Sequence, residues 1–537
     1  MYDVALTRSH FPAQTDDTVR ETTVPGVLGE AARAAPDAPG LIEADETGAI
    51  GRRWSYAALL ADAERLAKVL SSRFEPGERI AVWAPNSPEW VILEFAAGLA
   101  GLVLVTVNPA YQAKELHFIL EQSRAAALFL TRGFRGNRMA EIAKRVAAEL
   151  PALRHLVDME DADALYAAGD RRAAPCEVGA SDAAQIQYTS GTTGFPKGAV
   201  LSHRGLTNNS RFFCTRLGLQ PGDSYLNVMP MFHTAGCSMG VLGAVQHRAE
   251  LILARQFAGA AANALVARQG VAVTMGVPTM LIQMLEAFER EPVDFSSLRA
   301  VVSGGAMVPP ELIRKVQAVF GCGFEIVYGQ TETSPVLTQT RLTDSFADQS
   351  ETVGQPLPQT EIAIRDIGMN TVMPLDTVGE ICSRGYCNMI GYNDDMDATM
   401  DTVDANGWLH TGDLGTMDAR GFVRVTGRVK EMIIRGGENL FPAEIENVLL
   451  EHAGVAEVAV VGVPDEIWGE VAVCFFRPAA AVPTRDELVA HLRKDLAAPK
   501  TPAHFIAVED FPLTGSGKVQ KFVLRERFVA GDYPRRL

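Results

Sequence analysis

A ten-residue stretch rich in glycine and hydroxyl side chains constrains this chain more than any other segment. It reads Thr-Ser-Gly-Thr-Thr-Gly-Phe-Pro-Lys-Gly over residues 189–198. A short strand is predicted before it, over 184–188, and another after it, over 199–201. Glycines let consecutive backbone N–H groups surround an anion, and the hydroxyls and the lysine add donors suited to phosphate. The segment therefore predicts an anion-binding loop between two strands rather than a flexible linker.

This loop is not the P-loop of nucleoside triphosphatases, which requires Gly-x-x-x-x-Gly-Lys-Ser/Thr running into a helix. Here Pro196 precedes Lys197 and Gly198 follows it, so a helix cannot begin at the lysine. A helix is expected only later, over roughly 204–217.

Length and charge limit the class of protein. The 537 residues exceed what one core holds, so about three units of ordinary domain size are expected. A net charge of −16 argues against a general nucleic-acid binder, although it allows a local basic groove for a phosphorylated small molecule. The seven cysteines are scattered without Cys-x-x-Cys or zinc spacing, which predicts reduced cytosolic thiols and no disulfide framework or metal cluster.

Targeting signals are not evident. The first residues lack a basic start followed by an apolar run, so no secretory signal is expected. The most apolar stretch, 95–107, is broken by Gly98 and Gly101, and it predicts a core helix and strand rather than a membrane span. We expect a cytoplasmic protein.

Strands and helices alternate through the first two thirds of the chain. Ser55 is a predicted N-cap, followed by a strand at 79–83, a helix at 88–100, a strand at 101–107 and a helix at 114–122. A second alternating region runs to about 340, with strands at 250–253, 271–275, 299–302 and 325–327. This alternation predicts an α/β fold of parallel sheets covered by helices. Residues 1–50 are expected to wrap over the surface of the first domain.

The pattern of predicted strands and helices changes towards the C-terminus. Short strands at 360–364, 379–383 and 422–427 predict a β-rich subdomain. A small α+β unit follows, in which Pro442 begins one helix, Thr484 opens a capping box, and strands lie at 455–461 and 471–476. We therefore predict a large domain over 1–428 and a small mobile domain over 429–537, with the boundary near 428–430.

Polar side chains follow several predicted strands, where doubly wound sheets bind ligands. The pentapeptide 328–332, Tyr-Gly-Gln-Thr-Glu, offers a ring, a glycine, a hydroxyl and a carboxylate, which suit a nucleotide and a hydrated Mg²⁺, although it also fits a solvated turn. The segment 303–306 fits either a flat ligand or an ordinary turn.

Three single residues each allow a functional and a purely structural interpretation. Asp413, after a predicted hairpin, either accepts ribose hydroxyls or caps a surface turn. His233, in an apolar run, is either a satisfied core residue or part of a site. Lys518 lies on a turn near the C-terminus, where most lysines are merely exposed.

Together, in this order and spacing, these motifs resemble the adenylate-forming superfamily of acyl-CoA synthetases, luciferases and peptide-synthetase adenylation domains. The resemblance extends from about residue 50 to 527, and the signature at 188–198 is its most specific part. It implies a large N-terminal domain, a small mobile C-terminal domain, and an AMP-forming acyl-CoA synthetase of the medium-chain type.

For ATP, the resemblance assigns phosphate binding to the glycine-rich loop. These residues are Thr189, Ser190, Gly191, Thr192, Thr193, Gly194 and Lys197. It gives Mg²⁺ to Glu332 and Thr189, and places Thr331 near the phosphates. Adenine would contact Tyr328, Gly329, Gly305 and Ala306, and ribose would contact Asp413 and Arg428. Ile326 and Val327 stand where many relatives carry an amide, so side-chain recognition of the adenine amino group is not implied.

The implied reaction has two steps. A carboxylate attacks the α-phosphorus of ATP to give an acyl-adenylate and pyrophosphate, and the thiol of coenzyme A then takes the acyl group and releases AMP. Lys518 is implied as the catalytic lysine of the first step, alongside Glu332, Thr189 and His233. Rotation of the small domain about Lys430 would then bring Gly436 and Gly437 to the pantetheine tunnel.

The acid is expected to be apolar. Between residues 229 and 245 there is no Asp, Glu, Lys or Arg, whereas a buried ammonium or second carboxylate would need a charged partner. The predicted acyl-binding residues are His233, Cys237, Met239, Gly240, Val277, Ser303 and Gly304. A medium-chain fatty, branched or aryl acid fits them.

Other readings stay open. A free-standing enzyme loading a carrier protein and a luciferase-like oxygenase share the first step. A non-catalytic nucleotide-binding protein is disfavoured by the presence of Lys518 and Glu332. The expected partners are a small carboxylic acid, ATP and coenzyme A, with no nucleic acid and no stable membrane insertion; a homo-oligomer is left open.

Overall fold

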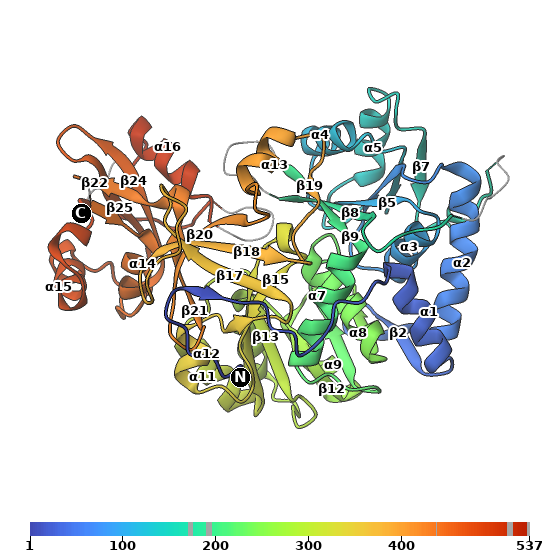
Figure 1. Cartoon of the computed structure of the whole chain (residues 1–537), viewed down its shortest axis with the longest axis horizontal. Helices are drawn as coiled ribbons and strands as arrows, with labels where there is room; N and C mark the ends of the chain where they lie inside the picture. Colours follow the sequence, from blue (N-terminus) through green and yellow to red (C-terminus); the bar gives the residue numbers. More distant parts are fainter. Residues whose placement is uncertain (170–175, 190–195, 437, 513–518, 534–537) are drawn as a thin grey trace.

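The computed structural model describes residues 1–169, 176–189, 196–436, 438–512 and 519–533, and Figure 1 shows its arrangement. Two large sheets form most of the molecule, which confirms the predicted α/β class. The first sheet has the order β19-β9-β8-β5-β4-β6-β7, in which β4 to β8 run parallel and β9 runs antiparallel to both of its neighbours, β8 and β19. Its strands are β4 (Arg79–Trp83), β5 (Val103–Val107), β6 (Ala127–Leu130), β7 (His155–Asp158), β8 (Ala183–Thr189), β9 (Lys197–Ser202) and β19 (Gly391–Tyr392).

The second sheet has the order β16-β15-β14-β13-β12-β10-β11-β2-β3, and its middle strands, from β14 to β2, are parallel. Its strands are β2 (Pro39–Ala44), β3 (Ile50–Ser55), β10 (Ser224–Asn227), β11 (Glu250–Ala254), β12 (Val271–Met275), β13 (Ala300–Gly304), β14 (Gly323–Gly329), β15 (Val336–Gln339) and β16 (Gln355–Pro356).

Helices cover and separate the two sheets, so that the layers alternate. One apolar core joins the facing sides of both sheets with the helices between them, and two further cores lie on their outer faces. The inner helices are α1 (Val24–Ala34), α2 (Tyr56–Arg73), α3 (Pro88–Leu99), α7 (His203–Arg216) and α8 (Gly243–His247). The outer helices are α4 (Ala113–Ser123) and α5 (Met139–Ala147) on the first sheet, and α9 (Gly259–Gln269), α10 (Pro278–Arg290) and α11 (Pro310–Phe320) on the second. The Ser55 hydroxyl accepts from the N–H of Ala58, which confirms the predicted N-cap of α2.

The first fifty residues do not wrap over the first domain, so that prediction was wrong. Strand β1 (His10–Phe11) pairs with β17 (Thr360–Arg365) of the β-rich part, α1 is largely buried, and β2 joins β11 in the second sheet. Figure 1 shows this dark blue segment running beside the yellow strands. Pairing between segments so distant in the chain leaves no local signature, because the partner is specified elsewhere.

The β-rich part is a five-stranded sheet with the order β1-β17-β18-β20-β21. Its other strands are β18 (Gly379–Gly385), β20 (Leu409–Met417) and β21 (Val423–Arg428). The helix α12 (Phe346–Glu351) precedes this sheet, and α13 (Met396–Thr402) lies within the segment. The predicted strands at 360–364, 379–383 and 422–427 are confirmed to within a few residues.

The last hundred residues have their own sheet and core, at the left of Figure 1. The strands are β22 (Ile433–Arg435), β23 (Glu438–Leu440), β24 (Val455–Asp465), β25 (Gly469–Pro478) and β26 (His504–Ala507), and the helices are α14 (Pro442–Leu450), α15 (Arg485–Asp495) and α16 (Lys521–Ala530). Pro442 begins α14 and the Thr484 capping box opens α15, as predicted. Among the described residues, no helix is long and apolar enough to cross a membrane.

Candidate active site

Three residues predicted to bind adenosine lie in contact at the C-terminal end of β14. The hydroxyl of Tyr328 donates to one oxygen of the Asp413 carboxylate at 2.9 Å, and the Nε of Arg428 lies 3.0 Å from the other oxygen. Asp413 and Arg428 are direct partners across β20 and β21. The Asp413 side chain is only 10% exposed, whereas that of Arg428 is 51% exposed. A buried carboxylate with paired donors is thus fixed beside an aromatic ring, as a nucleoside site requires.

Asp413 follows a small hairpin, as predicted, because an antiparallel bridge joins Val403 and Leu409 around a tight turn, and Asp413 then lies within β20. The pairing of β18 with β20 contains a bulge. Cys382 pairs with His410 and Glu380 pairs with Leu414, so two steps on β18 oppose four steps on β20. Gly412 in this bulge has φ +72°, a conformation that favours glycine. A bulge redirects the side chains beside it, and here it lies next to the carboxylate that meets Tyr328 and Arg428.

Tyr328 is a permanent hydrogen-bond donor in this site. Burial raises the pKa of its phenol well above the ordinary value of 10, and the neighbouring Asp413 carboxylate raises it further. The phenol therefore keeps its proton at any physiological pH.

Glu332 and Lys197 both contact one tyrosine, Tyr392. Glu332, in the 3₁₀ turn η2 (Thr331–Thr333), accepts a hydrogen bond from the hydroxyl of Tyr392 at 2.8 Å. The Nζ of Lys197 lies 5.0 Å from the centroid of the same ring. Thr189 pairs with Lys197 across β8 and β9. The structure therefore brings Thr189, Lys197 and Glu332 to one place.

Tyr392 was missed by the reasoning from sequence. It lies in β19, which pairs with β9, and this pairing brings it into contact with both Glu332 and Lys197. The Gly391-Tyr392 dipeptide does not by itself predict the pairing of β19 with β9. An aromatic residue after a glycine is only a weak indication that the tyrosine belongs to a site.

Glycines allow close backbone packing at the ends of β13 and β14, near Tyr328 in the chain. A Cβ added to Gly304 would lie 2.5 Å from the carbonyl oxygen of Val327, and one added to Gly329 would lie 1.9 Å from that of Pro335. Gly305 has φ +74° and, like Ala306, is exposed. The predicted adenine-binding residues thus form an open edge beside β13 and β14.

The predicted acyl-binding segment forms a π-helix, η1 (Ala235–Leu242), which was not predicted. His233 is exposed just before it, and its Nδ1 accepts from the N–H of Ala235 at 3.2 Å. Cys237 is buried, and its sulfur lies 3.2 Å from the Nε2 of Gln187 on β8. π-Helical segments occur frequently at functional sites.

The other predicted acyl-binding residues lie deeper. Gly240 packs against β10, because a Cβ there would lie 2.5 Å from the Nδ2 of Asn227. Met239 and Ser303 are buried, and Val277 is half-buried at the start of α10. Of this predicted set, His233 is the one with an exposed side chain.

Some predicted residues lie outside the described part of the chain. These are Ser190, Gly191, Thr192, Thr193, Gly194, Gly437 and Lys518. Of their neighbours, Lys430 is exposed in the turn η3 (Val429–Glu431). Gly436 has φ +58° and packs against Trp468, since a Cβ there would lie 2.8 Å from the indole ring.

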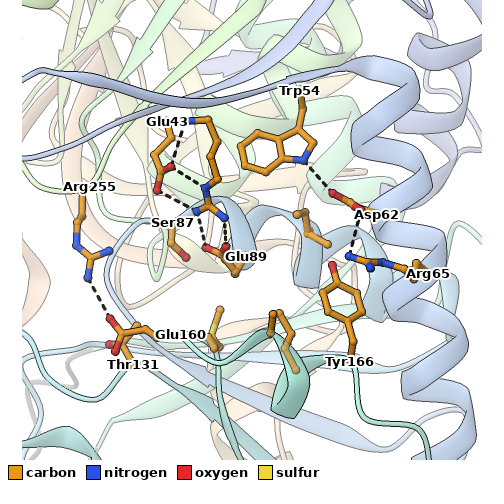
Figure 2. Close-up of a pocket in the computed structure, with 15 residues that line it drawn as sticks. Glu43, Trp54, Asp62, Arg65, Ser87, Glu89, Thr131, Glu160, Tyr166 and Arg255 are labelled. Atoms are coloured by element: carbon orange, nitrogen blue, oxygen red, sulfur yellow. Dashed lines mark hydrogen bonds and ion pairs between the residues drawn. The ribbon is translucent and has the colours of Figure 1, made fainter.

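A separate pocket of about 380 Å³ lies beside α2 and α3 (Figure 2). Its three guanidinium groups are paired with carboxylates. The pairs are Arg52 with Glu43 and Glu89, Arg65 with Asp62, and Arg255 with Glu160. A phosphate entering this pocket would compete with these carboxylates, so it is a poor candidate for the ATP phosphates.

Comparison with known proteins agrees with this geometry. The AMP-binding enzyme family matches residues 28–393, and the AMP-binding enzyme C-terminal domain matches residues 444–518. The chain therefore belongs to the AMP-binding enzyme family, which makes it a member of the adenylate-forming superfamily. Within that superfamily it is an enzyme of the acyl-CoA synthetase branch, the AMP-forming acid–thiol ligases.

The relatives match over nearly the whole chain. A putative acyl-CoA synthetase of Bacillus subtilis is 36% identical over 95% of this chain and 97% of its own length. A mitochondrial medium-chain acyl-CoA ligase of Rattus norvegicus is 34% identical over 97% of this chain and 89% of its own length.

Solved structures share the fold. ATP-bound MatB from Rhodopseudomonas palustris has a TM-score of 0.84 and 28% identity over 94% of this chain and 99% of its own. The o-succinylbenzoate CoA synthetase of Bacillus subtilis, in complex with its acyl-adenylate, has a TM-score of 0.81 and 28% identity over 94% of this chain and 98% of its own.

Proposed function

We propose that this enzyme activates an apolar carboxylic acid as its acyl-adenylate and transfers the acyl group to coenzyme A. The observation that carries the proposal is the pair of clusters beyond the strand ends, Tyr328–Asp413–Arg428 and Glu332–Tyr392–Lys197. The first suits a nucleoside, and the second suits phosphates with a cation. Together they fit an ATP molecule lying from the second sheet towards the loop after β8.

The residues of the second cluster fit Mg²⁺. Mg²⁺ is usually held by one or two carboxylates together with substrate phosphates and waters, and Glu332 offers one carboxylate beside the Thr189–Lys197 pair. Glu332 and Thr189 would hold the ion, which would neutralise charge on the leaving pyrophosphate.

The chain's own residues then perform distinct tasks. Asp413 accepts from the ribose hydroxyls while Arg428 and Tyr328 keep its carboxylate in place. Lys197 positions the phosphates, and Lys518 carries positive charge to the carboxylate and the α-phosphate. His233 borders the acid, since its ring is exposed at the mouth of the π-helix.

We further propose that domains 1–428 and 429–537 rotate about Lys430 between the two steps. The separate core of the C-terminal sheet supports an independent small domain. The exposed Lys430 and the β22–β23 turn at Gly436 suit a hinge and a loop that approaches coenzyme A.

A medium-chain fatty, branched or aryl acid is the proposed substrate class. The segment 229–245 contains no Asp, Glu, Lys or Arg, and much of it is buried among apolar side chains. The similarity to medium-chain acyl-CoA ligases supports this choice. Transfer to a carrier protein is the alternative, because it uses the same adenylate. The cytoplasmic location and a homo-oligomer stay predictions.

A panel of carboxylic acids tests the proposal. With ATP and Mg²⁺, AMP release is measured with and without coenzyme A, and thioester is identified by mass. Release that depends on coenzyme A and is greatest for apolar acids is expected. If no acid gives it, the ligase proposal fails; if release is greatest with dicarboxylates or amino acids, the proposed acid class fails.

A further inference from the structure

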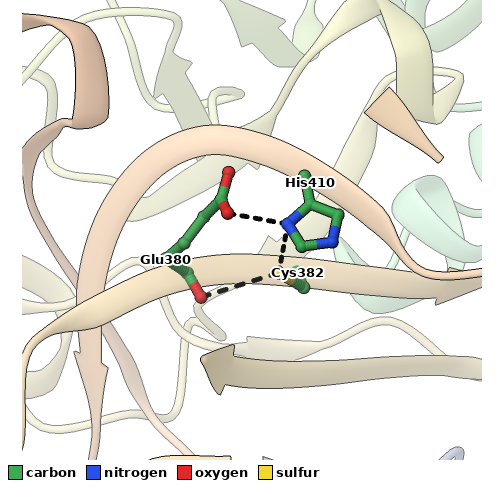
Figure 3. Close-up of side chains that lie close together, drawn as sticks. All are labelled: Glu380, Cys382 and His410. Carbon is green, nitrogen blue, oxygen red and sulfur yellow. Dashed lines mark hydrogen bonds and ion pairs between the residues drawn. The ribbon is translucent and has the colours of Figure 1, made fainter. Parts of the chain in front are cut away.

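Three side chains with different metal-binding atoms gather on the β-rich sheet (Figure 3). Glu380 and Cys382 are two positions apart on β18 and so face the same side. His410 is the direct partner of Cys382 on β20. A carboxylate oxygen, a thiol sulfur and an imidazole nitrogen therefore lie within 4.8 Å of one another. The spacing of the cysteines did not reveal this group, because its histidine lies 28 residues beyond Cys382.

The contacts arrange these atoms around the Nδ1 of His410. It lies 2.7 Å from Glu380 Oε2 and 3.5 Å from Cys382 Sγ. On the other side of the ring, Asp404 Oδ2 lies 3.9 Å from Nε2. The nearby cation Arg365 lies 3.6 Å from the same Asp404 carboxylate. Histidines that bind metals usually direct their second nitrogen towards a carboxylate, which is the position of Asp404.

We propose that Glu380, Cys382 and His410 form a Zn²⁺ site. Thiolate, imidazole and carboxylate together favour zinc over Mg²⁺ or Ca²⁺, which prefer oxygen atoms alone. Cys382 is buried, but the side chain of His410 is 23% exposed, so a water molecule completes four-fold coordination from that side. On binding, the Cys382 thiol loses its proton to solvent. The imidazole proton of Nδ1 moves to Nε2, beside Asp404, or leaves if both nitrogens carry one.

This site is linked to the proposed ATP site through Glu380. Its other oxygen, Oε1, accepts from the N–H of Gly412 at 3.0 Å, inside the bulge that precedes Asp413. The hydroxyl of Thr411 donates to the carbonyl oxygen of Ile381 on the same strand. Two ligand atoms of one tetrahedral zinc lie about 3.3 Å apart, so zinc must part Glu380 Oε2 and His410 Nδ1, which lie 2.7 Å apart without it. This shift of the Glu380 carboxylate disturbs its bond to Gly412, so Asp413 is held less firmly. This link rests on the proposed function, whereas zinc binding does not.

Cobalt(II) provides a direct probe of binding to the full-length protein. After treatment with a chelator, one equivalent of Co²⁺ is expected to give a thiolate-to-cobalt absorption band and tetrahedral d–d bands, both removed by Zn²⁺. Cys382→Ser is expected to abolish the thiolate band, and His410→Gln to weaken binding at least about tenfold. Cys176→Ser is the control, because Cys176 is more accessible than Cys382 and lies outside the group.

The absence of a thiolate band in the wild-type protein overturns the site, as does an undiminished band in Cys382→Ser. If Cys382→Ser does not fold, His410→Gln decides the question alone, since unchanged Co²⁺ affinity in that variant also overturns the site.

The link to ATP is tested separately, with zinc-loaded protein from which free metal has been removed. A severalfold rise in KM for ATP with little change in kcat is expected, and it should vanish in His410→Gln. Bound zinc with unchanged KM overturns the link but leaves the metal site intact. Failure of the acid panel with intact Co²⁺ spectra overturns the ligase proposal and not the metal site.

Discussion

The two ends of the proposed ATP site differ in how their charged side chains are paired. At the adenosine end, Asp413 and Arg428 form a direct ion pair that also receives a hydrogen bond from Tyr328. At the phosphate end, Glu332 accepts from the hydroxyl of Tyr392, and the Nζ of Lys197 lies over the ring of the same tyrosine. This pair can stay intact when the nucleoside binds, because the Asp413 carboxylate has further acceptor positions for the ribose hydroxyls. The adenosine end is thus organised to receive neutral hydroxyls, and the phosphate end keeps its charges available.

The largest expected effect tests whether the phosphate end suffices without the C-terminal lysine. Lys518→Ala is expected to reduce adenylate formation to below about one part in a thousand, because charge developing on the phosphates loses its partner. Thioester formation from supplied acyl-adenylate and coenzyme A should persist. The two half-reactions are measured separately, and an equal loss of both would contradict the proposed alternation.

Glu332→Gln comes next. We expect kcat for adenylation to fall about 100-fold to 1,000-fold, because the carboxylate is proposed to hold the cation. Tyr392→Phe is the matched variant: it keeps the ring that Lys197 contacts but removes the hydrogen bond to Glu332, and a loss of about fivefold is expected. If both variants lose activity to the same extent, the hydrogen bond from Tyr392 accounts for the effect of Glu332, and the proposed role of the carboxylate in holding the cation is contradicted.

Asp413→Asn tests the adenosine end. The amide is isosteric but uncharged, so the ion pair with Arg428 is lost. An increase in KM for ATP of about tenfold to 100-fold is expected, the range for a hydrogen bond to a charged group, with little change in kcat. Steady-state kinetics with varied ATP measure it. A fall in kcat at constant KM would show that Asp413 acts in the chemical step.

The smallest effect concerns β14, the strand that leads into both ends. Burial raises the pKa of Glu325 to about 8 from its ordinary 4.5, while Gln339 donates to its carboxylate at 2.6 Å. Between about pH 4.5 and about pH 8, the Glu325 carboxyl is protonated in the folded state and ionised in the unfolded state. Folding therefore takes up a proton in this range, and the contribution of Glu325 to the free energy of unfolding falls as pH rises from about 4.5 to about 8. The melting temperature should therefore decline less between about pH 6 and about pH 8.5 in Glu325→Gln. An identical decline in both proteins would contradict the raised pKa.

Sequence reasoning succeeded where local chemistry decides. The strand at 271–275 and the caps at Ser55 and Thr484 follow from residue type and spacing within a few positions. It located Tyr328, Asp413 and Arg428 through resemblance, and the structure shows that they touch. Their contact depends on a bulge in β20 that no local pattern marks.

What the sequence missed depends on partners far along the chain. Tyr392 reaches Glu332 because β19 pairs with β9, and β1 reaches β17 across most of the chain. Glu380 and His410 meet because β18 and β20 are neighbours. In each case the residue type is common, and only the pairing of strands makes it significant.

The π-helix at 235–242 gives the proposed acyl segment an unusual way to change. Its wide turns hold more residues for each turn than an α-helix does, so the loss of one residue would let it relax into ordinary helix. Because an α-helix turns further for each residue than a π-helix does, this relaxation would offset most of the lost rotation, so side chains within 235–242 would change direction while α8 keeps nearly the same orientation. A single deletion could thus exchange the face that Cys237 and its neighbours present to β8 without altering any residue type. In this fold, a deletion that rotates side chains around the helix axis can change substrate preference, as a substitution can.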